Sequence, residues 1–159
     1  MIRVSGWSGL DASVRRDVTG IYRDAARLMF DSLADTDNSS LDSGAPLASG
    51  HYAASMRIGL NASDTSVAPI DSSYNYPSPA QHHYSRWNLP APTIGPVASS
   101  TITNWLRPFK LGDIVYLSNS SAYAIVIENG RRGKNGSWQK PRGVFLPTLT
   151  KLFQQQGWM

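Results

Sequence analysis

The histidines are candidates for binding a metal or transferring protons, because imidazole ligates metals and titrates near neutral pH. The chain has three histidines, His51 and the adjacent pair His82 and His83. Neighbouring side chains on an extended segment point in opposite directions, and His51 does not stand at a recognised ligand spacing from the pair. The sequence therefore predicts no metal site.

A glycine-rich basic stretch, 130–135, has the composition of a phosphate-binding loop. A P-loop needs a glycine five residues before the second one and Ser or Thr after the lysine, to shape the backbone and bind Mg²⁺. Glu128 and Asn135 occupy those two positions, so the motif fails. The stretch stays a candidate for contact with DNA or an acidic partner, with a solvated loop as the alternative. Its candidate interface or lumen residues are Arg131, Arg132, Lys134, Trp138 and Lys140.

Catalytic constellations are not recognisable either. The sequence has no cysteine and no Gly-x-Ser-x-Gly elbow, so the usual signatures of thiol and serine nucleophiles are missing. Glu128 has no obvious carboxylate partner in its motif for acid–base work. We therefore expect neither an enzyme nor a bound cofactor.

Composition limits the class of protein. A chain of 159 residues with 16% charged residues and 10 prolines is expected to form a single loop-rich domain, 1–159. Its net charge of +4 is too small for a dedicated nucleic-acid binder. The lack of cysteine, of an apolar leader and of any window near ~20 apolar residues indicates a soluble protein made in a reducing cytoplasm, with no membrane partner.

Hydrophobic periodicity predicts the N-terminal half. Apolar residues at three- and four-residue steps predict an amphipathic helix from Leu10 to Leu33, with Asp11 as N-cap and close packing at Gly20. A period-two pattern predicts a strand from Tyr52 to Leu60, whose first residues have a helical alternative. The apolar stripe of the helix comprises Val14, Val18, Ile21, Tyr22, Ala25, Leu28 and Met29, and its charged face comprises Arg15, Arg16, Arg23, Asp24 and Arg27.

A proline-rich segment, 61–96, follows the strand and contains six prolines. Loops of this length in compact domains usually have a function or remain disordered. Its aromatic residues favour an extended arm that becomes ordered on a neighbouring subunit, and an arm folded onto its own core is the alternative. The candidate arm contacts are Tyr74, Tyr76, Tyr84 and Trp87.

The C-terminal third contains shorter elements. A helix capped by Ser99 or Ser100 is expected to stop before Pro108, followed by a turn at 110–113 and a strand at 114–118. The segment 123–128 has both strand and helix signals. A last helix is expected at 144–156, with Phe145, Leu149, Leu152 and Phe153 as its apolar stripe.

The order of residues in this third resembles a known family. A Gly-Asp turn and strand end at Asn119, a Tyr-Ala segment closes on a Glu-x-Gly, and a Pro-x-Gly loop leads into the last helix. This order is similar to that of the neck and tail-completion proteins of tailed bacteriophages, which join head and tail. The resemblance is strongest from Lys110 to Phe153, and 50–59 looks like the family's small-residue stretch before a strand. Its candidate structural motif is Asn119, Tyr123, Glu128, Gly130, Pro141 and Gly143.

This resemblance implies an α+β fold, in which a long N-terminal helix and a C-terminal helix pack on a small antiparallel sheet. It favours a short helix at 123–128 and implies no enzymatic activity and no cofactor. The expected role is a homo-oligomeric ring in the neck or head-proximal tail of the virion. A hexamer is the first choice because tails have six-fold symmetry, and a dodecamer matching the head connector is second. The implied partners are connector, stopper or adaptor proteins on one side and tail tube or tail terminator proteins on the other, with genomic DNA passing through the lumen.

Glu128 then acquires a structural expectation. A carboxylate in the last turn of a helix is unfavourable with the helix dipole, so it needs a partner such as an arginine or exposed backbone amides. An arginine from the basic loop or the neighbouring subunit is the preferred partner, and an exposed acid is the alternative.

Three other functions remain open. A tail terminator or head-side adaptor is the alternative within the virion. A small nucleic-acid-binding protein using the basic loop and Trp138 comes from a different class, and it predicts salt-dependent DNA affinity. An enzyme is the least favoured, since no catalytic constellation is found.

Overall fold

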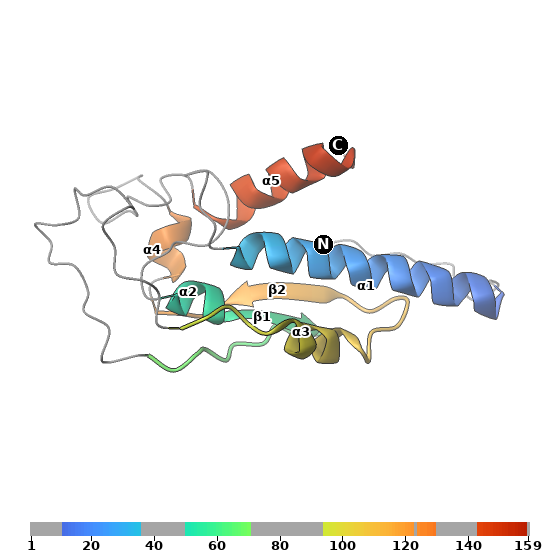
Figure 1. The fold of residues 1–159 in the computed structure, drawn as a ribbon, viewed down its shortest axis with the longest axis horizontal. Helices are drawn as coiled ribbons and strands as arrows, with labels where there is room; N and C mark the ends of the chain where they lie inside the picture. The colour runs from blue at the N-terminus through green and yellow to red at the C-terminus, as the bar shows by residue number, and fades with distance from the viewer. Residues whose placement is uncertain (1–10, 36–49, 71–93, 123, 130–142, 159) are drawn as a thin grey trace, which may run out of the picture.

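A computed structural model describes residues 11–35, 50–70, 94–122, 124–129 and 143–158. These residues form five helices and one two-stranded antiparallel sheet, so the fold is α+β (Figure 1). The elements follow in the order α1 (Ala12–Ala34), α2 (His51–Ala54), β1 (Met56–Leu60), α3 (Ser99–Leu106), β2 (Val115–Asn119), α4 (Ala124–Glu128) and α5 (Phe145–Gln156).

Helix α1 begins where the sequence predicts. The Asp11 carboxylate accepts a hydrogen bond from the Ser13 backbone N–H at 2.7 Å, which satisfies one of the open amides of the first turn. The predicted close packing at Gly20 is wrong, because a Cβ there would meet nothing within 4 Å. In Figure 1 the N-terminal end of α1 projects past the sheet, and residues 11–17 are exposed.

The face that α1 buries differs from the predicted stripe. The buried residues are Ala26, Phe30, Leu33 and Ala34, near the C-terminal end of the helix. Val14, Ile21 and Leu28, which belong to the predicted stripe, are exposed instead. Both sets recur at three- and four-residue steps, so α1 has two apolar faces and the periodicity alone does not choose between them.

The sheet joins two strands that are far apart in the sequence. β1 and β2 are antiparallel, with Met56 opposite Asn119 and Leu60 opposite Val115. The predicted strands are thus confirmed, except that residues 51–54 form α2, the helical alternative. The left-handed backbone at Gly50 directly precedes that helix.

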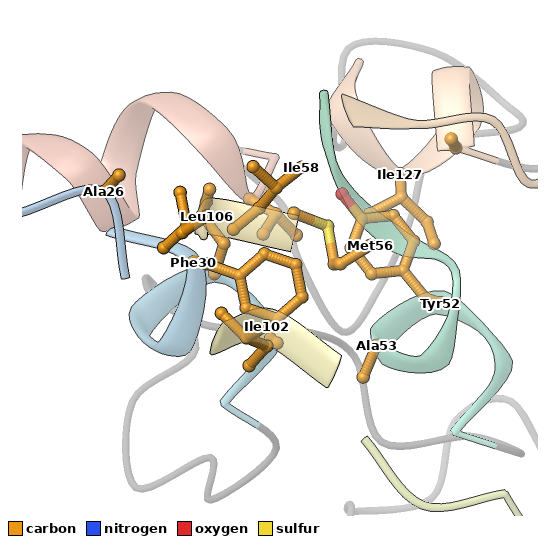
Figure 2. Packing of buried hydrophobic residues seen from close by; sticks show 13 residues of the cluster. Ala26, Phe30, Tyr52, Ala53, Met56, Ile58, Ile102, Leu106 and Ile127 are labelled. Atoms are coloured by element: carbon orange, nitrogen blue, oxygen red, sulfur yellow. The ribbon is translucent and has the colours of Figure 1, made fainter. Parts of the chain in front are cut away.

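One hydrophobic cluster joins most of these elements. Figure 2 shows Phe30 from α1, Tyr52 from α2 and Met56 from β1 converging on it, together with Ile102 and Leu106 from α3. Helix α5 lies against α1 and contributes Phe145 and Leu149 to the edge of the cluster. The remaining core positions include Ala26, Leu33, Ile58, Ala124, Ile127 and Val144.

Helix α3 lacks a serine cap at its start, and an arginine from α1 bonds the chain at its other end. Its N-cap is Ala98, with no side-chain cap bond, so the prediction that Ser99 or Ser100 caps it is wrong. At its other end Arg23, expected on the charged face of α1, donates to the carbonyl oxygens of Arg107 at 2.8 Å and Phe109 at 2.9 Å. These bonds satisfy carbonyls beyond the last turn, where helix α3 stops before Pro108.

Candidate functional site

Three of the residues singled out by sequence, Asn119, Glu128 and Gly143, lie within the described residues. Asn119 ends β2, Glu128 ends α4, and Gly143 lies two residues before α5 begins. Hydrogen bonds through Tyr52 and a close contact between Glu128 and Gly143 join them. The other candidates lie outside the described residues: Tyr74, Tyr76, Tyr84, Trp87, Tyr123, Gly130, Arg131, Arg132, Lys134, Trp138, Lys140 and Pro141.

Glu128 is the centre of this set. Its Oε2 accepts hydrogen bonds from the backbone N–H groups of Val144 at 3.2 Å and Phe145 at 3.1 Å. Helix α5 has no side-chain cap of its own and no acidic residue in its first turn, so the Glu128 carboxylate takes both roles from sixteen residues away. A negative group at a helix N-terminus is favourable with the helix dipole. The predicted need for a partner is met by backbone amides.

A second oxygen of the same carboxylate binds a tyrosine. The Tyr52 hydroxyl donates to Glu128 Oε1 at 2.5 Å, a length typical of a bond between a hydroxyl and an ionised carboxylate. Tyr52 is only 2% exposed, and its ring packs in the hydrophobic cluster while its hydroxyl reaches the edge. The preferred arginine partner of Glu128 is therefore not found among the described residues, where the donors are Tyr52 and two amides.

Asn119 ties the same tyrosine to the sheet. Its Nδ2 donates to the Tyr52 carbonyl oxygen at 2.8 Å, and its Oδ1 accepts from the Ser121 N–H at 3.0 Å. An asparagine at the end of a strand can hold the turn that follows in this way, by bonding a backbone group two residues on. Both ends of the amide are thus used, and the segment between β2 and α4 is fixed against α2.

Gly143 allows the start of α5 to lie close to Glu128. Its backbone has φ +84°, in the left-handed region that favours glycine. A Cβ at this position would lie 2.6 Å from the Glu128 carbonyl oxygen and 3.2 Å from its Oε2. A side chain there would push α5 away from the carboxylate that caps it, which gives the Pro-x-Gly of the sequence motif a physical reason.

We call Tyr52, Asn119, Glu128 and Gly143 the Glu128 network. Tyr52 was missed as a site residue, because the period-two pattern presented it as the first residue of a strand. The signal that could have found it is a tyrosine among small residues, since a buried tyrosine usually needs a partner for its hydroxyl.

The network has a structural consequence for the basic stretch. It brings Glu128 and Gly143 into contact, so the chain that leaves α4 must return to the same place before α5 begins. Between them lie Arg131, Arg132, Lys134, Lys140 and Arg142. Glu128 is the last acidic residue of the chain, so these cations follow it without a nearby acid in sequence. Glu128 and Gly143, on either side of this basic stretch, are therefore close together.

The chemistry of the network is structural. Both carboxylate oxygens of Glu128 accept hydrogen bonds from groups that hold the fold, namely the Tyr52 hydroxyl and the N–H groups of Val144 and Phe145. Within the described ranges, no three His, Cys, Asp or Glu side chains gather as a metal site would require. The described helices include none that combines the length and the apolar character of a membrane span.

A second polar cluster closes the open end of the sheet. Asp113 accepts from Asn61 Nδ2 at 2.9 Å and from the Lys110 N–H at 2.7 Å, which confirms the predicted turn at 110–113. The Asn61 bond, followed by the Lys110 bond, holds the pKa of Asp113 below its usual value. Asn61 itself has φ +62° and bonds the backbone of Ile114 through its Oδ1 and N–H.

Compared with known proteins, this chain matches no family model, no curated protein and no solved structure. The resemblance to phage neck proteins therefore rests on its motif residues, and the family remains a proposal.

Proposed function

We propose that this protein is a structural component of a tailed-bacteriophage virion, which forms a homo-oligomeric ring in the neck or at the head-proximal end of the tail. The ring joins or completes the tail and lets the genome pass. In this proposal function resides in surfaces and not in an active site, and the protein has neither enzymatic activity nor cofactor.

The observation that carries this proposal is the Glu128 network. Asn119, Glu128 and Gly143 belong to the sequence motif that resembles the neck family, and they are separated by up to 24 residues. Hydrogen bonds and a close backbone contact nevertheless unite them. Motif residues that meet at one place act as one structural unit. Here that unit joins Glu128 and Gly143, which lie on either side of the basic segment in the sequence.

The basic segment has one of two alternative roles in the proposed ring. Arg131, Arg132, Lys134 and Lys140, with Trp138 among them, line the lumen through which DNA passes or bind the next subunit. Cations facing a passing phosphate backbone need no sequence preference, because contacts to phosphates carry no base information. The faces of the ring bind connector, stopper or adaptor proteins on the head side and tail tube or terminator proteins on the tail side.

The proline-rich segment 61–96 serves as an arm between subunits in this proposal. Tyr74, Tyr76, Tyr84 and Trp87 give large contact areas with few rotatable bonds, which suits an interface. A hexamer is the preferred copy number and a dodecamer is second, because these match the symmetry of the tail and of the head connector.

Electron microscopy of particles made without this gene tests the proposal. DNA-filled heads beside free tails are expected. A complemented strain that expresses the wild-type protein is the control, and it should restore joined particles. Intact infectious virions made without the gene would refute the role at the head–tail joint.

DNA binding is the second candidate function, favoured by the charge distribution. After Glu128 the chain has six basic and no acidic residues, and five of the six lie in the segment held by the Glu128 network. Binding of this kind should weaken steeply with salt and should be lost when Arg131, Arg132 and Lys134 become alanine. A variant with Arg15 and Arg16 changed to alanine removes exposed charge elsewhere and serves as the control.

A further inference from the structure

The two-stranded sheet has one edge along β1 and one along β2. The Asn61 N–H donates to the Ile114 carbonyl oxygen at 2.8 Å, in line with the ladder that the two strands form. Hydrogen-bonded and non-hydrogen-bonded pairs alternate in an antiparallel ladder. In step with Asn61, the residues of β2 that bond to β1 are therefore Tyr116 and Ser118. The backbone groups of the odd-numbered residues of β2 point away from β1.

These outward groups are those of Val115, Leu117 and Asn119, and we call their N–H and C=O groups the β2 edge. Within the described ranges no hydrogen bond reaches these backbone groups. All three residues are only half-buried. A row of open backbone groups along a strand is a template on which another strand can pair.

The opposite edge, along β1, is covered. Helices α1 and α3 both pack against β1 (Figure 1). Met56 and Ile58, whose backbone groups face this edge, are 0% and 4% exposed. The Met56 carbonyl oxygen also accepts a hydrogen bond from Arg57 Nη1 at 2.9 Å. Of the two edges, β2 is therefore the one that a strand from another chain can reach.

β2 has none of the features that usually keep a strand edge from pairing. Natural edges are protected by charged side chains, by proline or by a bulge. The strand Val115–Asn119 contains neither charge nor proline, and its register with β1 runs without a bulge. The chain has no charged residue from Ile114 to Ile127. An edge of this composition favours a partner strand over solvent.

A second copy of β2 fits this edge. In an antiparallel pair Leu117 lies opposite Leu117 of the second copy, and Val115 lies opposite its Asn119. Each outward N–H group then faces a carbonyl oxygen of the other strand. A two-fold axis at Leu117 produces this pairing and keeps the core faces of both sheets on one side. Because β2 carries no charge, the axis sets no like charges against each other.

A two-fold axis does not allow two β2 strands to pair in parallel. In a parallel ladder a bonding residue lies opposite a non-bonding one, because its N–H and C=O reach the two neighbours of the residue that it faces. Symmetry would set Leu117 opposite Leu117, and both of these residues bond outward. Pairing of β2 with the β1 edge of another copy is prevented by the burial of Met56 and Ile58. The antiparallel pair is therefore the closed arrangement that this edge permits.

We propose that two copies of this chain pair antiparallel through their β2 edges, which forms one continuous sheet in the order β1-β2-β2-β1. The pairing goes beyond the proposed ring and does not depend on it, because a two-fold contact joins two chains and then closes. Its failure would leave the neck role untouched.

Single cysteines test the register, since the chain has no cysteine of its own. Leu117→Cys should form a disulfide-linked dimer, because facing Cα atoms of a hydrogen-bonded antiparallel pair lie about 5.5 Å apart, within disulfide range. Ile70→Cys is the control, because Ile70 is 69% exposed and lies outside the sheet. On non-reducing gels Leu117→Cys should cross-link roughly tenfold faster than Ile70→Cys or more.

A second pair of cysteines keeps the test decisive if Leu117→Cys, whose side chain packs against the core, does not fold. Tyr116 of one copy faces Ser118 of the other in the proposed pair. Tyr116→Cys and Ser118→Cys should therefore cross-link when mixed and much more slowly when each is alone. Equal rates for the mixture and for each variant alone would overturn the register.

Sedimentation velocity tests the dimer itself. The wild type should form a dimer with a dissociation constant below about 1 mM. Tyr116→Lys places a charge beside the edge and should weaken this dimer roughly tenfold, while circular dichroism checks that the helix content is unchanged. A wild type that stays monomeric up to about 1 mM would overturn the inference, as would a folded Leu117→Cys that cross-links no faster than Ile70→Cys.

Discussion

Replacing Glu128 tests the physical interpretation of the network most directly. Glu128→Ala removes the acceptor of three hydrogen bonds, from the Tyr52 hydroxyl and from the N–H groups of Val144 and Phe145. Val144 is fully buried, so its amide would lose its partner where water does not reach. A bond to a charged group contributes about 1.5–3 kcal/mol, and an unsatisfied buried donor costs about 1–3 kcal/mol. We expect a loss of about 3–5 kcal/mol in the free energy of unfolding.

Glu128→Gln separates shape from charge. The glutamine oxygen can still accept from the two amides, and its NH₂ group can donate to the Tyr52 hydroxyl oxygen. The charge at the N-terminus of α5, worth about 0.5–1 kcal/mol, is lost. The hydrogen bonds also become neutral ones of about 0.5–1.5 kcal/mol each, and the Tyr52 hydroxyl proton loses its acceptor. The expected loss is therefore about 1–2 kcal/mol, below that of Glu128→Ala.

Urea unfolding followed by tryptophan fluorescence measures both variants, with Gln155→Ala on the exposed side of α5 as a control of matched size. The control should stay within about 0.5 kcal/mol of wild type. A double-mutant cycle with Tyr52→Phe should give a coupling energy of about 1–3 kcal/mol, because the two residues share a bond. Equal losses for the glutamine and alanine variants, or an alanine loss below about 1 kcal/mol, would refute the assigned role of Glu128.

Three further outcomes follow from the structure. Gly143→Ala should lower stability by about 2 kcal/mol or more, because of its positive φ and its contact with Glu128, whereas Gly20→Ala should raise it by about 1 kcal/mol, both read by thermal unfolding. The pKa of Asp113 is lower in the folded protein than in the unfolded chain, so its contribution to stability is present above about pH 4 and is lost as pH falls through the folded pKa. Asp113→Asn should therefore flatten the pH dependence of stability below about pH 4, as measured by acid titration. Arg23→Ala should cost about 1–3 kcal/mol in urea unfolding, because it removes both hydrogen bonds that Arg23 Nη2 donates to the carbonyl oxygens of Arg107 and Phe109.

Sequence periodicity predicts most of the elements but not which way they face. The ends of α1 and α5 agree with the prediction within two residues, since apolar spacing and the Asp11 cap are local signals. The buried face of α1 was mispredicted because Val14, Ile21 and Leu28 repeat as regularly as Ala26, Phe30 and Leu33. Only tertiary packing decides which of two apolar faces enters the core.

The sequence predicts that Glu128 needs a hydrogen-bond donor, but it does not predict which groups donate. The dipole of a short helix indicates that Glu128 requires a donor, and this holds in the structure. Its donors are backbone amides, which every residue except proline has, so no residue type marks Val144 and Phe145 in advance. An arginine was preferred because it is recognisable in a sequence, whereas a helix N-terminus sixteen residues away is not.

The residues that stabilise the fold around Glu128 are not the basic residues that the proposed function uses. The hydrogen bonds beside 130–142 join Glu128 to Val144 and Phe145, all of which lie outside that range. The entropy of closing a loop grows only slowly with its length, so residues inside the segment can change at little cost to the fold. Selection on DNA or subunit contacts can then act on the cations while the Glu128 network keeps their base in place. Under the proposed function, contact residues in 130–142 could therefore change with their partners without changing the residues that hold the core.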